Sequence, residues 1–313
     1  MIIRGVNIAA VKQKMEVDRE AKASRHLILD GDGPAYRVAA KVKRLPTAIA
    51  NFQAAILTEL HMTGCGSATV HLTHRTCLKN NRMLVNARKP YQGQRKNKSK
   101  PPLLEPLREA MMQKENWLPE FQVRMHYDIE ADDAMVIQAH HLGMDGVIWS
   151  DDKDLRCTPY LYYNQSTGTV DGPEPHGWVS AKLTDAGNLK VVGRGPVFFW
   201  AQMLMGDSAD NVAGLARYNG ALCGPAATLK VLEGVQDRDE AANLVIDGYR
   251  KIEQNVIAEG YLLHLLQHRR DHVYDYMLSH DLTPENREFV QWCMQQPWMR
   301  QSEYEEEVDL PWD

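Results

Sequence analysis

The sequence is poor in cysteine. Its five cysteines are odd in number, lie far apart and include no C-x-x-C pair; they are Cys65, Cys77, Cys157, Cys223 and Cys293. This spacing excludes a disulfide framework and a zinc knuckle. We therefore expect a reducing, cytoplasmic compartment for this chain.

Long apolar runs are also missing. The most apolar stretch, residues 197–205, is far shorter than the roughly 20 residues that a membrane-spanning helix needs. The N-terminus carries no apolar segment of the kind found in signal peptides. The sequence therefore predicts no membrane partner.

Excess charge of one sign is small for the whole chain but large in two segments. The net charge is only −5, which by itself does not indicate a nucleic-acid-binding protein. Residues 88–100 nevertheless carry six basic side chains and no acid, whereas residues 303–313 carry six acids. A basic segment on an otherwise acidic body suits contact with phosphate groups.

Strand-like and helix-like segments alternate over roughly the first two thirds of the chain. Strands are predicted at residues 26–30, 69–73, 121–127, 146–150 and 159–163. Helices are predicted between them at residues 35–60, 103–113 and 131–142. This alternation predicts an α/β fold with a doubly wound, mostly parallel sheet.

Beyond residue 196 the pattern becomes helical. Helices are expected at residues 197–205, 226–232, 237–259, 261–276 and 284–296. We therefore divide the chain into an α/β core, a helical region and an acidic tail, at residues 1–195, 196–302 and 303–313. A polar, basic excursion interrupts the core at about residues 76–113 and contains several prolines.

Carboxylates gather in three short clusters and one isolated pair. They are Glu130-Ala131-Asp132-Asp133, Asp151-Asp152-Lys153-Asp154, Asp207-Ser208-Ala209-Asp210 and Asp30-Gly31-Asp32. Several follow predicted strands, where open α/β sheets place their ligands. Gathered like charges repel, and carboxylate oxygens suit Mg²⁺ or Mn²⁺. Each cluster alone also fits helix caps or turns, but their joint placement favours a metal site.

These segments together resemble the 5′-nuclease family. The resemblance rests on Leu29-Asp30-Gly31, the Glu130 cluster, Ser150-Asp151-Asp152-Lys153-Asp154 and the run from Met205 to Gly214, in this order. The family includes flap endonucleases, the 5′-nuclease domains of bacterial DNA polymerase I and bacteriophage 5′ to 3′ exonucleases. Because the chain stands free of a polymerase region, it is most similar to the phage exonucleases, which act in the cytoplasm of a bacterial host.

The resemblance implies a phosphodiesterase that uses two Mg²⁺ ions, with Mn²⁺ as a substitute, about 4 Å apart. The first ion would be held by Asp30, Glu130, Asp132 and Asp152. The second would be held by Asp154, Asp207 and Asp210. In this assignment Asp32, Asp133 and Asp151 are bystanders.

In the family, the basic excursion resembles a helical arch that receives a free 5′ end. Tyr91-Gln92-Gly93-Gln94-Arg95 is similar to the family's Tyr-Lys-x-x-Arg pattern, so Tyr91 would stack on a base and Arg95 would hold a phosphate. Gln92 stands at the lysine position, so Lys89 or Lys96 would have to supply the missing charge. Arg82 matches a further phosphate-binding arginine.

A second departure lies after the 69–73 strand, where His74 replaces the family's acid. A third lies in residues 214–228, which resemble a helix-three-turn-helix element that binds duplex phosphates, in the family through K⁺. Gly214 and Gly224 are kept, but Leu222 replaces a glycine and Ala226 a lysine. Duplex binding is expected, and the K⁺ contact is left open by these replacements.

The function expected from the resemblance is 5′ to 3′ hydrolysis of duplex DNA at ends or nicks, with flap or RNA-primer removal. RNA–DNA hybrids are further substrates to test, and the acidic tail could dock a basic replication protein. Two alternatives stay open. One is an endoribonuclease of the related PIN type, and the other is a DNA-end-binding module with weakened catalysis.

Overall fold

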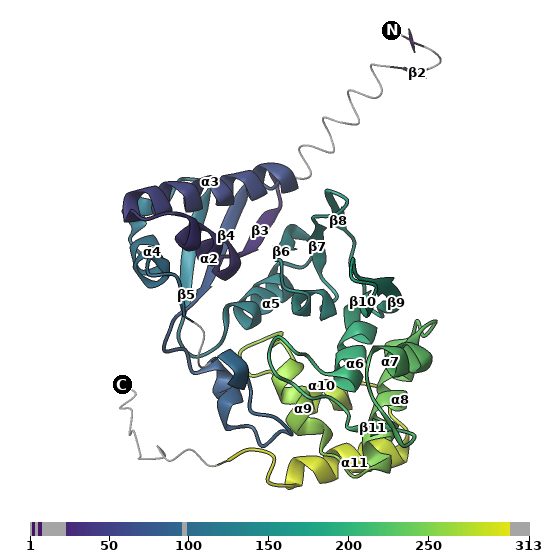
Figure 1. The fold of residues 1–313 in the computed structure, drawn as a ribbon. Coiled ribbons are helices and arrows are strands. Elements are labelled where there is room, and N and C mark those ends of the chain that lie inside the picture. Colours follow the sequence, from purple (N-terminus) through teal and green to yellow (C-terminus); the bar gives the residue numbers. More distant parts are fainter. Residues whose placement is uncertain (1, 4–5, 8–22, 96–98, 301–313) are drawn as a thin grey trace, which may run out of the picture.

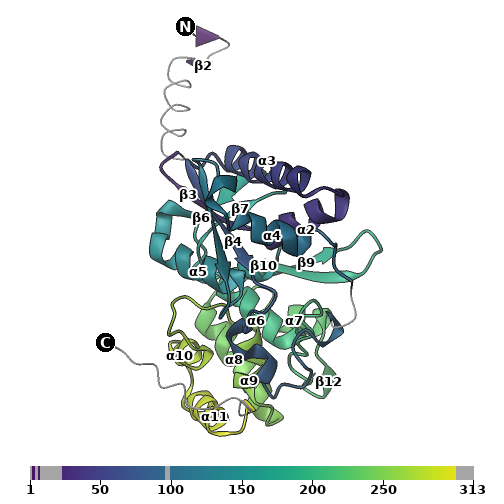
Figure 2. The ribbon, with the colours of Figure 1, turned by 90° about the vertical axis from the view of Figure 1, so that its left-hand side faces the viewer.

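The computed structural model describes residues 2–3, 6–7, 23–95 and 99–300. Lys96 and the acidic tail, residues 303–313, lie outside these ranges. Figures 1 and 2 show a sheet-bearing part above a helical part. Within the described ranges, no helix is long and apolar enough to cross a bilayer.

The sheet-bearing part is built on six strands in the order β5-β4-β3-β6-β7-β8. The strands are β3 (His26–Asp30), β4 (Ser67–Thr73), β5 (Phe121–His126), β6 (Gly146–Trp149), β7 (Leu161–Asn164) and β8 (Thr169–Asp171). All neighbouring strands are parallel except β7 and β8. The predicted doubly wound, mostly parallel sheet is therefore confirmed, with β8 as an antiparallel edge strand that the sequence did not indicate.

Helices cover both faces of this sheet. One face carries α2 (Asp32–Lys41), α3 (Leu45–Thr63) and α4 (Leu104–Met111), and the other carries α5 (Ala131–Leu142). Because side chains alternate along a strand, Leu27 and Leu29 pack in the core under α3, whereas Ile28 packs in the core under α5. The helix expected at residues 35–60 is instead two helices, since Pro46 lies in the first turn of α3 and Arg44 before it is extended.

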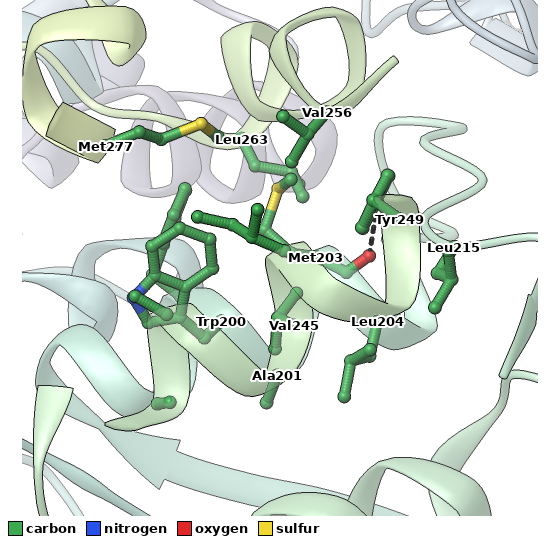
Figure 3. Packing of buried hydrophobic residues seen from close by; sticks show 14 of the residues in the cluster. Trp200, Ala201, Met203, Leu204, Leu215, Val245, Tyr249, Val256, Leu263 and Met277 are labelled. Atoms are coloured by element: carbon green, nitrogen blue, oxygen red, sulfur yellow. Dashed lines mark hydrogen bonds between the residues drawn. The ribbon is translucent and has the colours of Figure 1, made fainter. Parts of the chain in front are cut away.

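The helical part surrounds one buried helix. Its elements are α6 (Gly195–Met205), α7 (Pro225–Leu232), α8 (Arg238–Lys251), α9 (Val256–Leu263), α10 (Val273–Leu278) and α11 (Pro284–Gln295). All residues of α6 except Met205 are buried, which explains why its sequence is apolar on every side. Figure 3 shows Trp200 and Met203 of α6 among side chains of α8 and α9, with the Tyr249 hydroxyl donating to the Met203 carbonyl at 2.6 Å.

Three expectations for the helical part fail. The helix expected at residues 261–276 is interrupted after Leu263 and resumes at Val273. Between these ends the Asp271 carboxylate accepts hydrogen bonds from the Gln267 amide at 2.7 Å and from His264 Nε2 at 2.9 Å, which favours a loop. Strands also occur within the helical part, as the hairpin of β11 (Arg217–Tyr218) with β12 (Ala221–Leu222). The helix expected at residues 237–259 is likewise divided, because α8 ends at Lys251 and α9 begins at Val256. Before the helical part, a further hairpin of β9 (Trp178–Leu183) with β10 (Leu189–Arg194) lies outside the main sheet.

The remaining elements are short. They are the strand pair β1 (Ile2–Ile3) and β2 (Val6–Asn7) and the 3-10 turns η1 (Lys79–Leu84), η2 (Gly93–Arg95), η3 (Lys114–Asn116), η4 (Gly143–Asp145) and η5 (Asp154–Cys157).

Part of the segment expected to be a polar excursion, residues 79–95, packs against the helical part of the protein. Val85 and Tyr91 are buried in the apolar core that α6 occupies. The Asn86 amide donates to the Trp298 carbonyl at 2.7 Å, and the Arg300 amide donates to the Leu84 carbonyl at 2.9 Å. Figure 1 shows this blue segment beside the helical part. It therefore joins the two parts of the molecule along one side.

Candidate metal centre

The carboxyl edge of the sheet collects several of the predicted acids. Asp30 is the last residue of β3, and Asp152 comes three positions after the end of β6. These neighbouring strands mark the place where the strand order reverses, and open α/β sheets bind ligands there. Asp132 lies in the first turn of α5, where the helix dipole favours an anion.

Asp30, Asp132 and Asp152 form what we call the first acid group. The Asp30 oxygens accept hydrogen bonds from Ser150 Oγ at 2.8 Å and from the Asp32 amide at 3.0 Å. Burial, together with the charges of Asp32 and Asp152, raises the pKa of Asp30 to about 7. Burial, together with the charges of Asp30 and Asp152, also raises the pKa of Asp132 well above its usual value. Among the described residues, no Lys or Arg forms an ion pair with this group.

Asp154, Asp207 and Asp210 form the second acid group. One oxygen of each lies within 4.8 Å of the others. The Asp154 amide donates to Asp152 Oδ1 at 3.0 Å, which links the two groups through the backbone. Burial and the neighbouring charge of Asp152 raise the pKa of Asp154 to about 7, against the opposing effect of the Lys153 charge.

A tight loop after α6 aims the second group. The backbones of Asp207 and Val212 exchange two hydrogen bonds, of 2.9 and 2.7 Å. Gly206 begins this loop with a φ of 73°, and a Cβ there would lie 2.3 Å from the Val212 carbonyl oxygen. Only glycine fits that position. The loop thereby turns Asp207 back toward η5, which carries Asp154.

The donor set fits a hard divalent cation. Both groups offer only carboxylate oxygens, which Mg²⁺ and Mn²⁺ prefer. Asp207 is 3% exposed, and its Oδ2 atom has no hydrogen-bond partner among the described residues. A buried carboxylate oxygen without a hydrogen bond is costly unless a cation balances it, and the cation beside this atom is the Lys153 ammonium group, at 3.2 Å.

Glu130, expected to ligate the first ion, faces cations of the protein. Its Oε1 atom lies 2.9 Å from Lys79 Nζ, and its Oε2 atom lies 3.1 Å from Arg82 Nη1. The Tyr91 hydroxyl lies 2.7 Å from Glu130 Oε2 and 3.2 Å from Asp210 Oδ2. Burial acts to raise the pKa of Glu130, but the charges of Arg82 and Lys79 outweigh it and the pKa is lowered. Glu130 therefore lies between the acid groups and the residue 79–95 segment.

No protein-family model matches the chain, and no curated protein matches its sequence. Among solved structures, the flap endonuclease of bacteriophage T5 in a complex with DNA and metal ions superposes with a TM-score of 0.51 at 14% identity, covering 86% of this chain and 98% of that chain. The chain has the fold of the 5′-nucleases. The T5 protein co-crystallised with metal ions gives a TM-score of 0.49 at 15% identity, and the T5 5′-exonuclease with bound zinc gives 0.48 at 16%. Both cover the same shares of the two chains.

Two residues expected to contact DNA are buried in this 5′-nuclease fold. Tyr91 is 5% exposed, so its ring is not a surface on which a base can stack. Arg82 is 2% exposed, and its guanidinium donates to both oxygens of Asp133, at 2.7 and 2.8 Å. Asp133 itself is fully buried. Arg82 is thus not placed to hold a phosphate, and Asp133 is a structural partner of Arg82 and not a bystander.

Lys79 reaches the site although the sequence analysis did not select it. Its ammonium group pairs with Glu130 and donates to Gln92 Oε1. Lys79, Asn80 and Asn81 have φ values of 53°, 51° and 57°, a left-handed run that non-glycine residues rarely adopt. The available signal was the spacing Lys79-x-x-Arg82, which has the Lys-x-x-Arg form that we had sought thirteen residues later, at Gln92 and Arg95.

The other residues of the excursion that were expected to contact DNA differ in their exposure. Gln92 is 7% exposed and donates from Nε2 to Asp210 Oδ1 at 3.0 Å. Lys89 is exposed. Arg95 ends η2, but its side chain, like Lys96, lies outside the described part of the chain. The structure therefore brings Gln92 and Lys79 together at Glu130.

The two glycines expected to bind duplex phosphates differ in access. The Gly214 amide donates to Glu259 Oε2 at 3.1 Å, and its carbonyl accepts from Gln254 Nε2 at 2.9 Å. Both backbone groups of Gly214 are thus used inside the protein. Gly224 precedes α7, and a Cβ built there would meet no atom within 4 Å. Of the two glycines, only Gly224 has open space where a side chain would stand, although its carbonyl accepts a hydrogen bond from the Thr228 amide at 2.9 Å. The β11–β12 hairpin fills the longer loop between them.

His74, at the position of the family's acid after β4, and Asp32, after β3, both interact with residues outside the two acid groups. His74 Nδ1 lies 2.8 Å from Thr76 Oγ1, and its ring lies 4.5 Å from that of Tyr127. Asp32 accepts hydrogen bonds from the Thr73 amide at 3.1 and 3.2 Å and pairs with Arg108 at 2.7 Å. Asp32 therefore ties the β3 and β4 ends to α4.

Proposed function

We propose that the protein is a divalent-metal-dependent 5′ to 3′ nuclease that hydrolyses phosphodiester bonds of duplex DNA from 5′ ends or nicks, with flap or RNA-primer removal as related activities. The observation that carries this proposal is the meeting of two acid groups at the switch point of a 5′-nuclease fold. The likeness of the fold to a flap endonuclease crystallised with DNA and metal ions supports the choice of DNA as substrate.

The seven carboxylates have two roles in this proposal. The first acid group with Glu130 would hold one Mg²⁺ or Mn²⁺ ion, and the second acid group would hold another. When bound, such ions activate water and neutralise charge on the phosphate. The Tyr91 hydroxyl orients Glu130 and Asp210, since it lies within hydrogen-bond distance of both carboxylates.

The basic residues supply the phosphate contacts. Lys79, at the margin of the acid groups, would place positive charge beside the scissile phosphate. Arg88 and Lys89 are exposed on the packed segment and would bind the phosphates of the strand, as would Arg95 and Lys96. The amide of Gly224, the residue before α7, would face a duplex phosphate.

Metal removal is the first test. A 5′-labelled duplex should release short labelled products with Mg²⁺ and none with EDTA, because the acid groups repel one another and the phosphate without cations. Nicked, flapped, blunt and RNA-primed duplexes in one gel would rank the substrates. Equal cleavage after the 5′ end is blocked would contradict a 5′ to 3′ exonuclease, and cleavage of structured RNA but not nicked DNA would favour the PIN-type alternative.

Lys79→Ala should lower the single-turnover cleavage rate by about 10²- to 10³-fold, because a fixed charge beside the reacting phosphate is lost. Lys89→Ala is the matched control and should weaken DNA binding slightly at an unchanged rate. Gln92→Lys should leave the wild-type rate nearly unchanged but restore much of the rate in a Lys79→Ala background, since the two side chains are in contact. Loss of rate in Lys89→Ala and not in Lys79→Ala would contradict this role for Lys79.

A further inference from the structure

The second acid group contains a cation supplied by the chain itself. Lys153 Nζ lies 2.9 Å from Asp154 Oδ1 and 3.2 Å from Asp207 Oδ2. The side-chain amide of Gln202 also donates, from Nε2 to Asp154 Oδ1 at 2.6 Å. In the described part of the chain, Asp30, Asp132 and Asp152 have no such ammonium or guanidinium partner, and the cations near the first ion site, Lys79 and Arg82, pair among its ligands with Glu130 alone. The two groups of aspartates therefore differ in whether a resident charge already balances them.

Lys153 donates a hydrogen bond to Asp154 but balances the charge of Asp207 without one. Asp207 Oδ2 lies 3.2 Å from the ammonium group, yet the geometry gives it no hydrogen bond. The lysine side chain is 32% exposed, whereas that of Asp207 is 2% exposed. An ammonium group on a flexible four-carbon stem can thus leave toward solvent, while the carboxylates are fixed by their loop and turn.

We propose that Lys153 is an exchangeable counter-cation of Asp154, Asp207 and Asp210 that must withdraw before a divalent ion binds them. Metal loading is then ordered. The first ion meets three carboxylates that carry no Lys or Arg partner within the described ranges, and of its four ligands only Glu130 has to turn from the side chains of Lys79 and Arg82. The second ion binds only in exchange for the Lys153 ammonium. This inference rests on the divalent metal binding of the proposed function and goes beyond it to the order and relative affinity of the two ions.

The test is a titration of the metal-free full-length chain with Mn²⁺. Calorimetry and the electron paramagnetic resonance signal of free Mn²⁺ monitor the binding of each ion. Lys153→Gln should bind the second ion about tenfold more tightly, because a partly exposed ion pair no longer competes, and should leave the first ion within about twofold. Lys182→Gln, an exposed lysine on β9, should match the wild type at both sites. Lys153→Arg keeps the charge and should also retain the weaker second site.

The metal-free form gives an independent measurement. In EDTA, Lys153→Gln should melt a few degrees below the wild type, and saturating Mn²⁺ should remove that difference. If the variant does not fold, the wild type with ¹³C-methylated lysines can be titrated with Mg²⁺. The Lys153 methyl resonance should then shift with the second equivalent of Mg²⁺ and not with the first.

The outcomes separate this inference from the proposed function. No divalent binding by the wild type would reject the metal centre altogether. Two bound ions with unchanged affinities in Lys153→Gln, or a lysine resonance that shifts with the first equivalent, would overturn the role of Lys153 alone.

Discussion

Asp152→Asn is expected to lower the single-turnover rate of DNA cleavage by at least about 10³-fold while DNA binding is retained. Asp152 belongs to the first acid group, and its Oδ1 atom also accepts the Asp154 amide at 3.0 Å. An amide can keep that hydrogen bond but loses the negative charge that holds a divalent ion. Under the proposed function, the exposed basic side chains of residues 79–95 would still contact the DNA phosphates. A filter or fluorescence binding assay and a rapid-quench rate measurement separate the two effects.

The neighbouring acid provides the control for this prediction. Asp151 is 44% exposed in its side chain and pairs with Arg37 on the surface, so Asp151→Asn should cleave at nearly the wild-type rate. A wild-type rate for Asp152→Asn would reject the metal assignment. If the wild type itself binds DNA ends without turnover and Asp152→Asn behaves identically, the chain is a DNA-end-binding module.

Much of the sheet-bearing part was predictable because its signals are local. β3 and α5 have the expected bounds of residues 26–30 and 131–142. An apolar run that ends in acids predicts a buried strand at a ligand edge, and Glu130 before a helix predicts an N-terminus. Such patterns depend on residues within a few positions of one another. They therefore survive without knowledge of tertiary contacts.

The residue 79–95 segment was not predictable in the same way. Its composition is polar and basic, and only Val85 and Tyr91 are apolar anchors in the core beside α6. Arg82 is buried by partners far along the chain, including the His264 carbonyl, to which Nη2 donates at 2.8 Å. No local pattern indicates a contact between positions so distant. Composition thus predicted an exposed excursion. In the structure, long-range hydrogen bonds and ion pairs hold this segment against the rest of the protein.

The sequence also could not show how the charges of the site are balanced. Lys153 and Lys79 lie in or near the motifs, but only their side-chain positions reveal that one faces the second acid group and the other faces Glu130. A lysine between two acids is equally compatible with a solvated turn. The distinction depends on burial, which sets the cost of leaving a carboxylate without a cation.

Arg82→Ala is expected to lower the free energy of unfolding by about 3–5 kcal/mol, because it leaves a buried carboxylate without its partner. Asp133 is fully buried and receives two guanidinium hydrogen bonds, of 2.7 and 2.8 Å. The same guanidinium ties α5 to the loop after α9 through the His264 carbonyl. Urea denaturation of the metal-free protein would measure the loss, which is a large share of the roughly 5–15 kcal/mol typical of a folded domain.

An exposed arginine gives the comparison that isolates burial. Arg37 pairs with Asp151, and the two side chains are 49% and 44% exposed, so Arg37→Ala should cost at most about 1 kcal/mol. The double change Arg82→Met with Asp133→Leu should recover a large part of the loss, since an apolar pair removes the unbalanced charge. An Arg82→Ala variant as stable as Arg37→Ala would mean that the Arg82–Asp133 pair is not buried in solution. The residue 79–95 segment would then be free to move away from the helical part, as a mobile arch would require.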